Sequence, residues 1–312
     1  MARLARKHIV ASGEEGFYHV VNRVAGFPRY LPFKRGRVRK TLLNRLIKCL
    51  KIYCIDCFAF TIMGNHFHIV LRVNEFRKLT RRELERRACE RWGDKEWEVK
   101  TRHWDDERWL RFNRDLFDLG SFMKHLESPF VAWYNKAFGR EGTMWKSRYT
   151  SLHLKDLDAV QECLFYVELN PVRAHLKARP EHWKEGSAVM RMNGEDELLI
   201  PLREVFPELP ENEPVLPHYR ARMLYRGLTT PKEGQGFIEE EIIRMEEARN
   251  FVDPGAYLTK LRFMTHGLVL GSSDQIANRL ERLLRLGVYK RKRNPPRQLR
   301  GRLCTLREQR SH

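Results

Sequence analysis

The sequence predicts an α+β fold in which helices lie on one face of a mainly antiparallel sheet. Two observations lead to this prediction. Segments with the alternating or continuous apolar residues of strands are interleaved with segments whose apolar residues recur every three or four positions, as in amphipathic helices. Two strand-like segments, residues 53–63 and 66–73, are separated only by Gly64 and Asn65, a pair typical of a β-hairpin.

The predicted elements follow one another in a simple order. The first is a strand over residues 17–23, rich in aromatic and β-branched side chains. An amphipathic helix over residues 37–51 comes next, and then the hairpin. An inserted helical stretch over residues 75–118 is charged and carries four tryptophans. After it, the pattern predicts a long helix, a strand and a second helix, over residues 119–138, 144–154 and 157–167.

The domain organisation is predicted from shifts in composition. We expect a first domain over residues 1–190, in which residues 75–118 are the insert. Residues 191–217 are acidic and rich in proline, which favours a linker. A helical extension over residues 218–286 then leads to a basic tail, residues 287–312, which holds nine Lys and Arg and one Glu.

The net charge indicates the kind of partner. The chain has 59 Lys and Arg against 40 Asp and Glu, a formal net charge of +19. A surplus of this size favours a polyanion, and nucleic acid is the commonest polyanion that a basic protein binds.

The composition excludes several other classes of protein. Hydrophobic residues make up 42% of the 312 residues, enough for a folded core. No segment approaches the ~18 unbroken apolar residues of a membrane helix, and no signal-peptide core follows the basic start. Six cysteines in so long a chain are not a disulfide framework. We therefore expect a cytoplasmic, nucleoid-associated protein with no membrane partner.

The strand over residues 66–73 carries the most informative pattern. Alternate residues of a strand share a face, so its four apolar residues form one face and the two histidines share the other. Two imidazoles on one face can reach a single divalent ion. The alternative, for an isolated His-x-His, is two ordinary histidines on the solvent side of a sheet. The apolar residues are Phe67, Ile69, Leu71 and Val73, and the histidines are His66 and His68.

A second candidate site lies on the helix over residues 157–167. Tyr166 stands off the apolar stripe of this helix, and Asn170 follows four residues later, so both side chains project from the same face. An amide oxygen can be a hard metal ligand. Pro171 should end or kink the helix, which places Asn170 in its last turn. Taken alone, Tyr166 is better explained as a half-buried packing residue.

Four segments resemble motifs of one family, and their order along the chain is the same as in that family. Residues 63–72 (MGNHFHIVLR) resemble the His-hydrophobic-His signature of the HUH single-tyrosine transposases. Residues 165–174 (FYVELNPVRA) resemble the nucleophile helix of that family, in the form found in the REP-associated tyrosine transposases. Residues 17–23 (FYHVVNR) and 142–149 (GTMWKSRY) also resemble family segments. The resemblance covers about residues 16 to 185.

The resemblance implies a fold, a chemistry and a set of roles. It implies a ferredoxin-like core that works as a dimer on single-stranded or hairpin DNA. Tyr166 would be the nucleophile, and His66, His68 and Asn170 would hold a divalent metal ion, Mg²⁺ or Mn²⁺. Attack by the tyrosine would leave a 5′-phosphotyrosine and a free 3′-OH, so the chain would be a metal-dependent single-strand endonuclease and strand transferase, a transposase.

DNA contacts are expected where basic residues gather. Residues 29–51 contain nine Lys and Arg and no acid, with Tyr30, Phe33 and Tyr53 nearby, a pattern typical of a groove that follows phosphates and stacks bases. For the residues in strands, an ordinary place on the sheet surface is the alternative. The residues expected to contact DNA are Asn22, Arg23, Lys34, Arg35, Arg37, Arg39, Lys40, Arg148 and Arg173.

Two alternatives remain open at the level of sequence. A domesticated, non-catalytic DNA- or RNA-binding protein could keep the same fold, although such a protein has no need of Tyr166 together with both histidines. The lone pair Cys54 and Cys57 has no second pair at zinc spacing, so core cysteines are the better interpretation.

Overall fold

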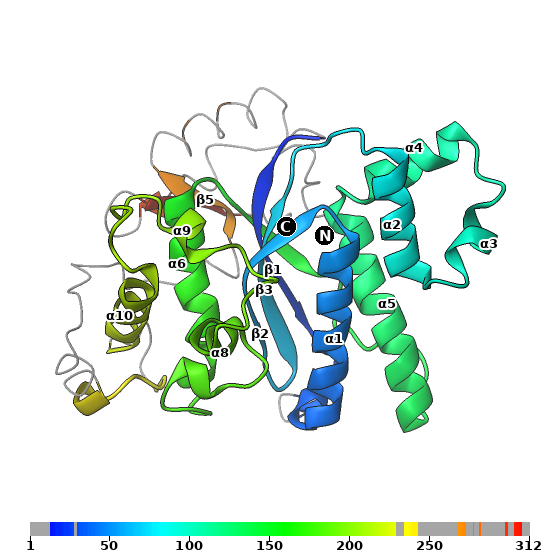
Figure 1. Cartoon of the computed structure of the whole chain (residues 1–312). Coiled ribbons are helices and arrows are strands. Elements are labelled where there is room, and N and C mark those ends of the chain that lie inside the picture. The colour runs from blue at the N-terminus through cyan, green and yellow to red at the C-terminus, as the bar shows by residue number, and fades with distance from the viewer. Residues whose placement is uncertain are drawn as a thin grey trace.

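The fold is given by a computed structural model, which describes residues 13–27, 30–228, 234–242, 267–272, 277, 281, 297–298 and 303–307 (Figure 1). The strands are β1 (Gly16–Arg23), β2 (Ile55–Ile62), β3 (His66–Val73), β4 (Thr150–Leu154), β5 (Gly267–Ser272), β6 (Arg297–Gln298) and β7 (Leu303–Arg307). The α-helices are α1 (Gly36–Ile52), α2 (Arg81–Trp92), α3 (Trp97–Thr101), α4 (Asp106–Asp115), α5 (Leu119–Phe138), α6 (Leu157–Glu168), α7 (Asn170–Arg173), α8 (Ser187–Asn193), α9 (Leu202–Val205) and α10 (Val215–Leu228).

The first four strands form the antiparallel sheet that the sequence predicted. They lie in the order β2-β3-β1-β4, and β1 is antiparallel to both of its neighbours. The connections β1-α1-β2 and β3-α5-β4 place their helices on one face (Figure 1). This order and these connections are those of a ferredoxin-like core, and the α+β class is confirmed.

The first core lies between the sheet and the helices α1 and α5. The four apolar residues of β3 that alternate with its histidines are buried in it, as the strand period predicts. From α1, the side chains of Val38, Leu42 and Leu46 step by four and pack against the sheet.

Helices also cover the opposite face, beyond the single helical layer that the sequence predicted. In Figure 1, α6, α8, α9 and α10 lie on the side of the sheet away from α1 and α5. The strands bury Val70, Leu152 and Leu154 on this face, against Val160 and Leu164 of α6. The sheet is therefore apolar on both faces in its middle, and a second core forms there.

The segment predicted as a linker, residues 191–217, contributes to this second core. It contains α9, and Leu202, Val205 and Phe206 are buried in the same cluster as α6. Pro201 caps the start of α9 and Pro207 follows its end, and the apolar residues between these prolines pack inward. The insert over residues 75–118 is helical, as predicted, and consists of α2, α3 and α4.

The described part of the basic tail belongs to the sheet, where the sequence predicted an arm outside the core. β7 pairs antiparallel with β5, and β5 pairs parallel with β4. The run Leu303–Arg307 contains leucine, cysteine and threonine, residues that suit a strand despite the basic surroundings. Most of the predicted extension after α10 lies outside the described residues. Within the described part of the chain, no helix combines the length and apolar character needed to cross a bilayer.

Candidate active site

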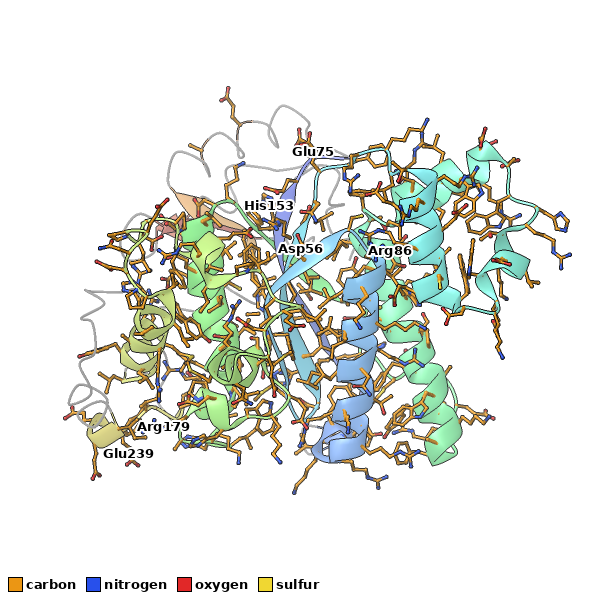
Figure 2. All side chains as sticks on the ribbon, in the orientation of Figure 1. Asp56, Glu75, Arg86, His153, Arg179 and Glu239 are labelled. Atoms are coloured by element: carbon orange, nitrogen blue, oxygen red, sulfur yellow. The ribbon has the colours of Figure 1, made fainter. Side chains whose placement is uncertain are left out.

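The two histidines of β3 lie on the face of the sheet that α6 covers. Phe67 and Ile69 point into the first core, so strand alternation turns His66 and His68 to the opposite face. The centroids of the two imidazole rings are 5.1 Å apart, and the rings are nearly perpendicular. His68 is buried and His66 is half-buried. Glu75, which follows β3, is labelled at the upper end of the sheet in Figure 2, so β3 begins toward the lower end.

Tyr166 reaches the same place from α6. Most of this helix is buried in the second core, and Asp156 caps its start by accepting a hydrogen bond from the backbone N–H of Ala159. The centroid of the Tyr166 ring lies 5.6 Å from that of His68, at an interplanar angle of 89°. The helix therefore brings together a phenol and an imidazole from segments that are about 100 residues apart.

A third histidine, His19 of β1, completes this cluster. Its Nε2 lies 3.0 Å from Nδ1 of His68, and the two rings are stacked with centroids 5.2 Å apart. Its centroid is 5.8 Å from that of Tyr166. The sequence analysis did not assign His19 a role. A strand over residues 17–23 does put His19 on the same face as Val21 and Arg23. The pairing of Val21 with His68, which brings that face to the β3 histidines, is visible only in the structure.

The hydrogen bonds of the β3 histidines leave the same nitrogen of each ring for another partner. His66 Nδ1 is 2.8 Å from the Asn65 side-chain oxygen, which can only accept, so this Nδ1 carries the proton. If His68 Nδ1 donates to His19 Nε2, the lone pair of Nε2 remains on both His66 and His68. Such outer hydrogen bonds on one ring nitrogen are the usual partners of metal-ligating histidines.

Burial keeps these imidazoles neutral. It lowers the pKa of His66 to about 4, and the positive charge of Arg23 adds to the effect. Burial also holds the pKa of His68 well below its usual value, with smaller contributions from the neighbouring His66, His19 and Arg23. Neutral imidazole is the form that binds a metal ion.

Tyr166 is a protonated phenol in this setting. Burial raises its pKa above the usual value, and the hydrogen bond of the Asn170 side chain offsets only part of that effect. A buried neutral phenol is a weak nucleophile, so attack on a phosphodiester needs an electrophilic partner close by.

Asn170 stands one helical turn beyond Tyr166, at the start of α7. Its side-chain N–H donates to the backbone carbonyl of Tyr166 at 2.8 Å, which leaves the amide oxygen available. The donor set of two neutral imidazoles and one amide oxygen suits a divalent ion that keeps water or a phosphate oxygen as its other ligands. Among the residues that the structure describes, no three His, Cys, Asp or Glu side chains form a metal-binding group. The candidate metal donors at this site, two imidazoles and one amide oxygen, are therefore all uncharged.

The predicted DNA contacts fall into two groups. Six of these residues are exposed: Arg23, Lys34, Arg35, Arg37, Lys40 and Arg148. Arg23 is paired with His66 in the sheet register, directly beside the cluster.

The other three predicted contacts serve the interior. Asn22 is buried and donates to Glu127 at 2.8 Å. Arg39 binds Glu185 and the carbonyl of Phe33. Arg173 donates to the carbonyls of residues 226, 227 and 236. Two of the predicted stacking rings, Phe33 within the basic run and Tyr53 just after it, are also buried, because this segment folds with its apolar residues inward. Cys54 and Cys57 are free thiols in the core.

Comparison with known proteins gives one distant likeness. No protein-family model matches the chain, and no curated protein matches it. Among solved structures, a REP-associated tyrosine transposase bound to a REP hairpin is similar, with 14% sequence identity and a TM-score of 0.40. The match covers 64% of this chain and 89% of the other.

Proposed function

We propose that the protein cleaves and rejoins single-stranded or hairpin DNA through a covalent bond between Tyr166 and the 5′-phosphate at the cut. The observation that supports this proposal is the position of Tyr166 against the paired imidazoles of His66 and His68. A phenol packed beside two neutral imidazoles that could hold a divalent ion suits attack on a phosphodiester. A protein that only binds DNA has no use for it.

The reaction exchanges one phosphoester for another. The phenol oxygen of Tyr166 forms a bond to phosphorus, the bond from phosphorus to the 3′ oxygen breaks, and the proton lost by the phenol is balanced by the one that the 3′-OH gains. The phosphotyrosine keeps the energy of the phosphodiester, so a second 3′-OH can attack it and rejoin the strand. No nucleotide cofactor is needed for this exchange.

The residues around Tyr166 divide the remaining work. His66, His68 and Asn170 would hold a divalent ion, Mg²⁺ or Mn²⁺, and when bound that ion would act as a Lewis acid on the phosphoryl oxygen. His19 would hold the ring of His68 in its tautomer through the 3.0 Å contact. Arg23, exposed beside His66, offers a positive charge for the neighbouring phosphate.

A denaturing gel tests the proposal directly. The wild type, incubated with 3′-end-labelled hairpin DNA and Mn²⁺, should give a labelled band at the mass of the protein plus the attached fragment, because the fragment joined to Tyr166 carries the 3′ end. Tyr166→Phe should give none while binding the same DNA with unchanged affinity, because the ring and its packing remain. Tyr225→Phe on α10 is the matched control and should form the adduct. Adduct formation by Tyr166→Phe would assign the attack to another residue.

The same gel separates the enzyme from its rival. A wild-type chain that binds hairpin DNA with high affinity and forms no adduct with Mg²⁺ or Mn²⁺ would be the non-catalytic nucleic-acid-binding protein instead.

A further inference from the structure

The loop after β1 presents an exposed aromatic side chain. Phe27 is 86% exposed, and Leu31, four residues later, is 41% exposed. A phenylalanine left in water costs hydrophobic free energy, which makes it informative when a second exposed apolar residue adjoins it.

The backbone ties this loop to the hairpin that leads into His66. The N–H of Val24 donates to the carbonyl of Asn65 at 2.8 Å, and that of Phe33 donates to the carbonyl of Gly64 at 3.0 Å. Leu31 packs on Gly64, where an added Cβ would come within 3.2 Å of its side chain. Arg23 is paired with His66, and the four residues from Arg23 to Phe27 can span at most about 14 Å. Phe27 thus follows the end of β1 that is paired with the start of β3.

The conformation of the loop is fixed by one glycine and one tyrosine. Gly26 has φ +128°, a value that side chains rarely adopt, and a Cβ there would meet the ring of Tyr30 at 3.0 Å. The N–H of Tyr30 donates to the carbonyl of Phe27 at 2.8 Å, and its hydroxyl lies 2.9 Å from that of Tyr134 on α5. Phe27 thus stands exposed next to a glycine with an unusual φ, and its carbonyl accepts from a tyrosine anchored on α5.

Arginines surround this turn in fixed positions. The guanidinium of Arg140 lies over the ring of Tyr30 at 5.1 Å and hydrogen-bonds to its hydroxyl. Arg35 lies over Phe138 at 4.8 Å, and Arg37 over Trp133 at 5.9 Å. In the described part of the chain no carboxylate pairs with these three arginines.

A guanidinium that rests on an aromatic ring keeps its charge and has lost part of its side-chain freedom before any ligand arrives. Residues 23–51 contain no acidic residue to oppose the resulting field. A surface that combines an exposed ring with pre-positioned guanidinium groups suits a chain of alternating phosphates and unpaired bases.

We infer that Phe27, with Leu31 and the arginines 35, 37 and 140, is a platform on which an unpaired base of a DNA single strand stacks. The inference deepens the proposed function, on which it rests, and it names the partner of this surface as single-stranded DNA. A duplex, whose bases are already stacked on each other, cannot use the ring of Phe27.

Equilibrium binding without divalent ions tests the platform separately from cleavage. The wild type and Phe27→Ala are titrated into a fluorescent single-stranded oligonucleotide, and Val99→Ala is the control. Val99 is an exposed apolar residue on α3, which lies far from the start of α1 in Figure 1. Loss of one base stack by alanine substitution should weaken binding about five- to 150-fold. Val99→Ala should bind like the wild type.

An oligonucleotide with one abasic position identifies the stacked base. When the missing base is the one that Phe27 contacts, the wild type should bind as weakly as Phe27→Ala, and the variant should lose nothing further. Moving the abasic position along the strand locates this base. Arg140→Ala should instead weaken binding to every oligonucleotide and reduce the slope of log affinity against log salt.

Three results would overturn the inference. Phe27→Ala could bind as tightly as the wild type, it could lose the same factor on every abasic oligonucleotide, or the wild type could fail to bind single strands. If the covalent adduct on Tyr166 still forms in any of these cases, the proposed function stands and the platform alone is wrong. If the adduct is absent but the abasic pattern appears, the platform stands without the nuclease.

Discussion

The phenol of Tyr219 on α10 donates a 2.5 Å hydrogen bond to the buried carboxylate of Glu168, two residues beyond Tyr166 on α6. Ser187 of α8 donates to the other carboxylate oxygen at 2.6 Å, and its hydroxyl also accepts from the backbone N–H of Phe60 on β2. The last turn of α6 is thus tied at one carboxylate to α10, and through Ser187 to the sheet. The helix that carries Tyr166 is therefore fixed in position by residues of α8 and α10, which follow it in the chain.

Loss of the Tyr219 hydroxyl should destabilise the whole fold. Tyr219→Phe leaves a buried carboxylate with one partner fewer, and an unmet polar group of this kind costs about 1–3 kcal/mol in the free energy of unfolding. Urea denaturation measures the change. Tyr225→Phe, on the half-buried side of the same helix, is the control and should change the free energy much less. Equal stability of both variants would mean that Tyr219 does not hold α6.

The contribution of Glu127 to stability should fall as the pH rises from about 4.5 to about 7. Burial raises the pKa of this carboxyl to about 7, and the hydrogen bond from Asn22 only partly opposes the rise. In that window the folded state binds the proton more tightly than the unfolded state, so raising the pH favours unfolding.

Glu127→Gln tests this prediction, since the amide oxygen can still accept from Asn22. The variant should match the wild type near pH 4.5 and become more stable as the pH rises, by at most about 3 kcal/mol above pH 7. Glu141→Gln removes an exposed carboxylate and is the control. A constant difference between Glu127→Gln and the wild type over this range would show that Glu127 does not titrate there.

Removal of either β3 histidine should abolish Mn²⁺ binding as well as adduct formation. Each ring would supply one of the three uncharged donors of the proposed metal site. Neither His66→Ala nor His68→Ala would leave enough donors to hold the ion. Calorimetric titration with Mn²⁺ measures binding, and His103→Ala in the exposed part of the insert is the control. Adduct formation that persists in excess chelator would contradict a metal-dependent reaction.

His19→Ala should weaken Mn²⁺ binding by about 10–100-fold, because outer hydrogen-bond partners of ligating histidines have effects of this size. His19→Gln should recover part of the affinity, since its side-chain oxygen can accept from His68 Nδ1. If Gln and Ala weaken binding equally, the contact between His19 and His68 has no role in orienting the ring.

Local pattern was sufficient to predict most of the core. The period-two alternation of β3 separates Phe67 and Ile69 from His66 and His68, and one helix with Asp156 as its cap places Tyr166 off its apolar stripe. Both features depend only on neighbours in sequence. The register of β1 on β3 does not, so His19 was missed although its own strand was predicted.

Composition gave a wrong prediction where a few buried apolar residues determine the structure of a mostly polar segment. The segment around Leu202 and Phe206 has the prolines and acids of a linker, yet its apolar residues fill the second core. Arg173 was predicted to contact DNA, and in the structure its guanidinium donates to three backbone carbonyls. A side chain's partner, rather than its type, decided both cases.

The parallel pairing of β4 with β5 has a consequence for the synthesis of the chain. His153 and Leu154 find their partners in Val269 and Leu270, more than 100 residues later. At about 5–20 residues per second, the ribosome needs roughly 6–20 seconds to make that stretch. During this interval β4 is an edge strand with open backbone groups, a template for pairing between nascent chains. The protein should therefore depend on chaperones or slow expression more than its compact first domain would suggest.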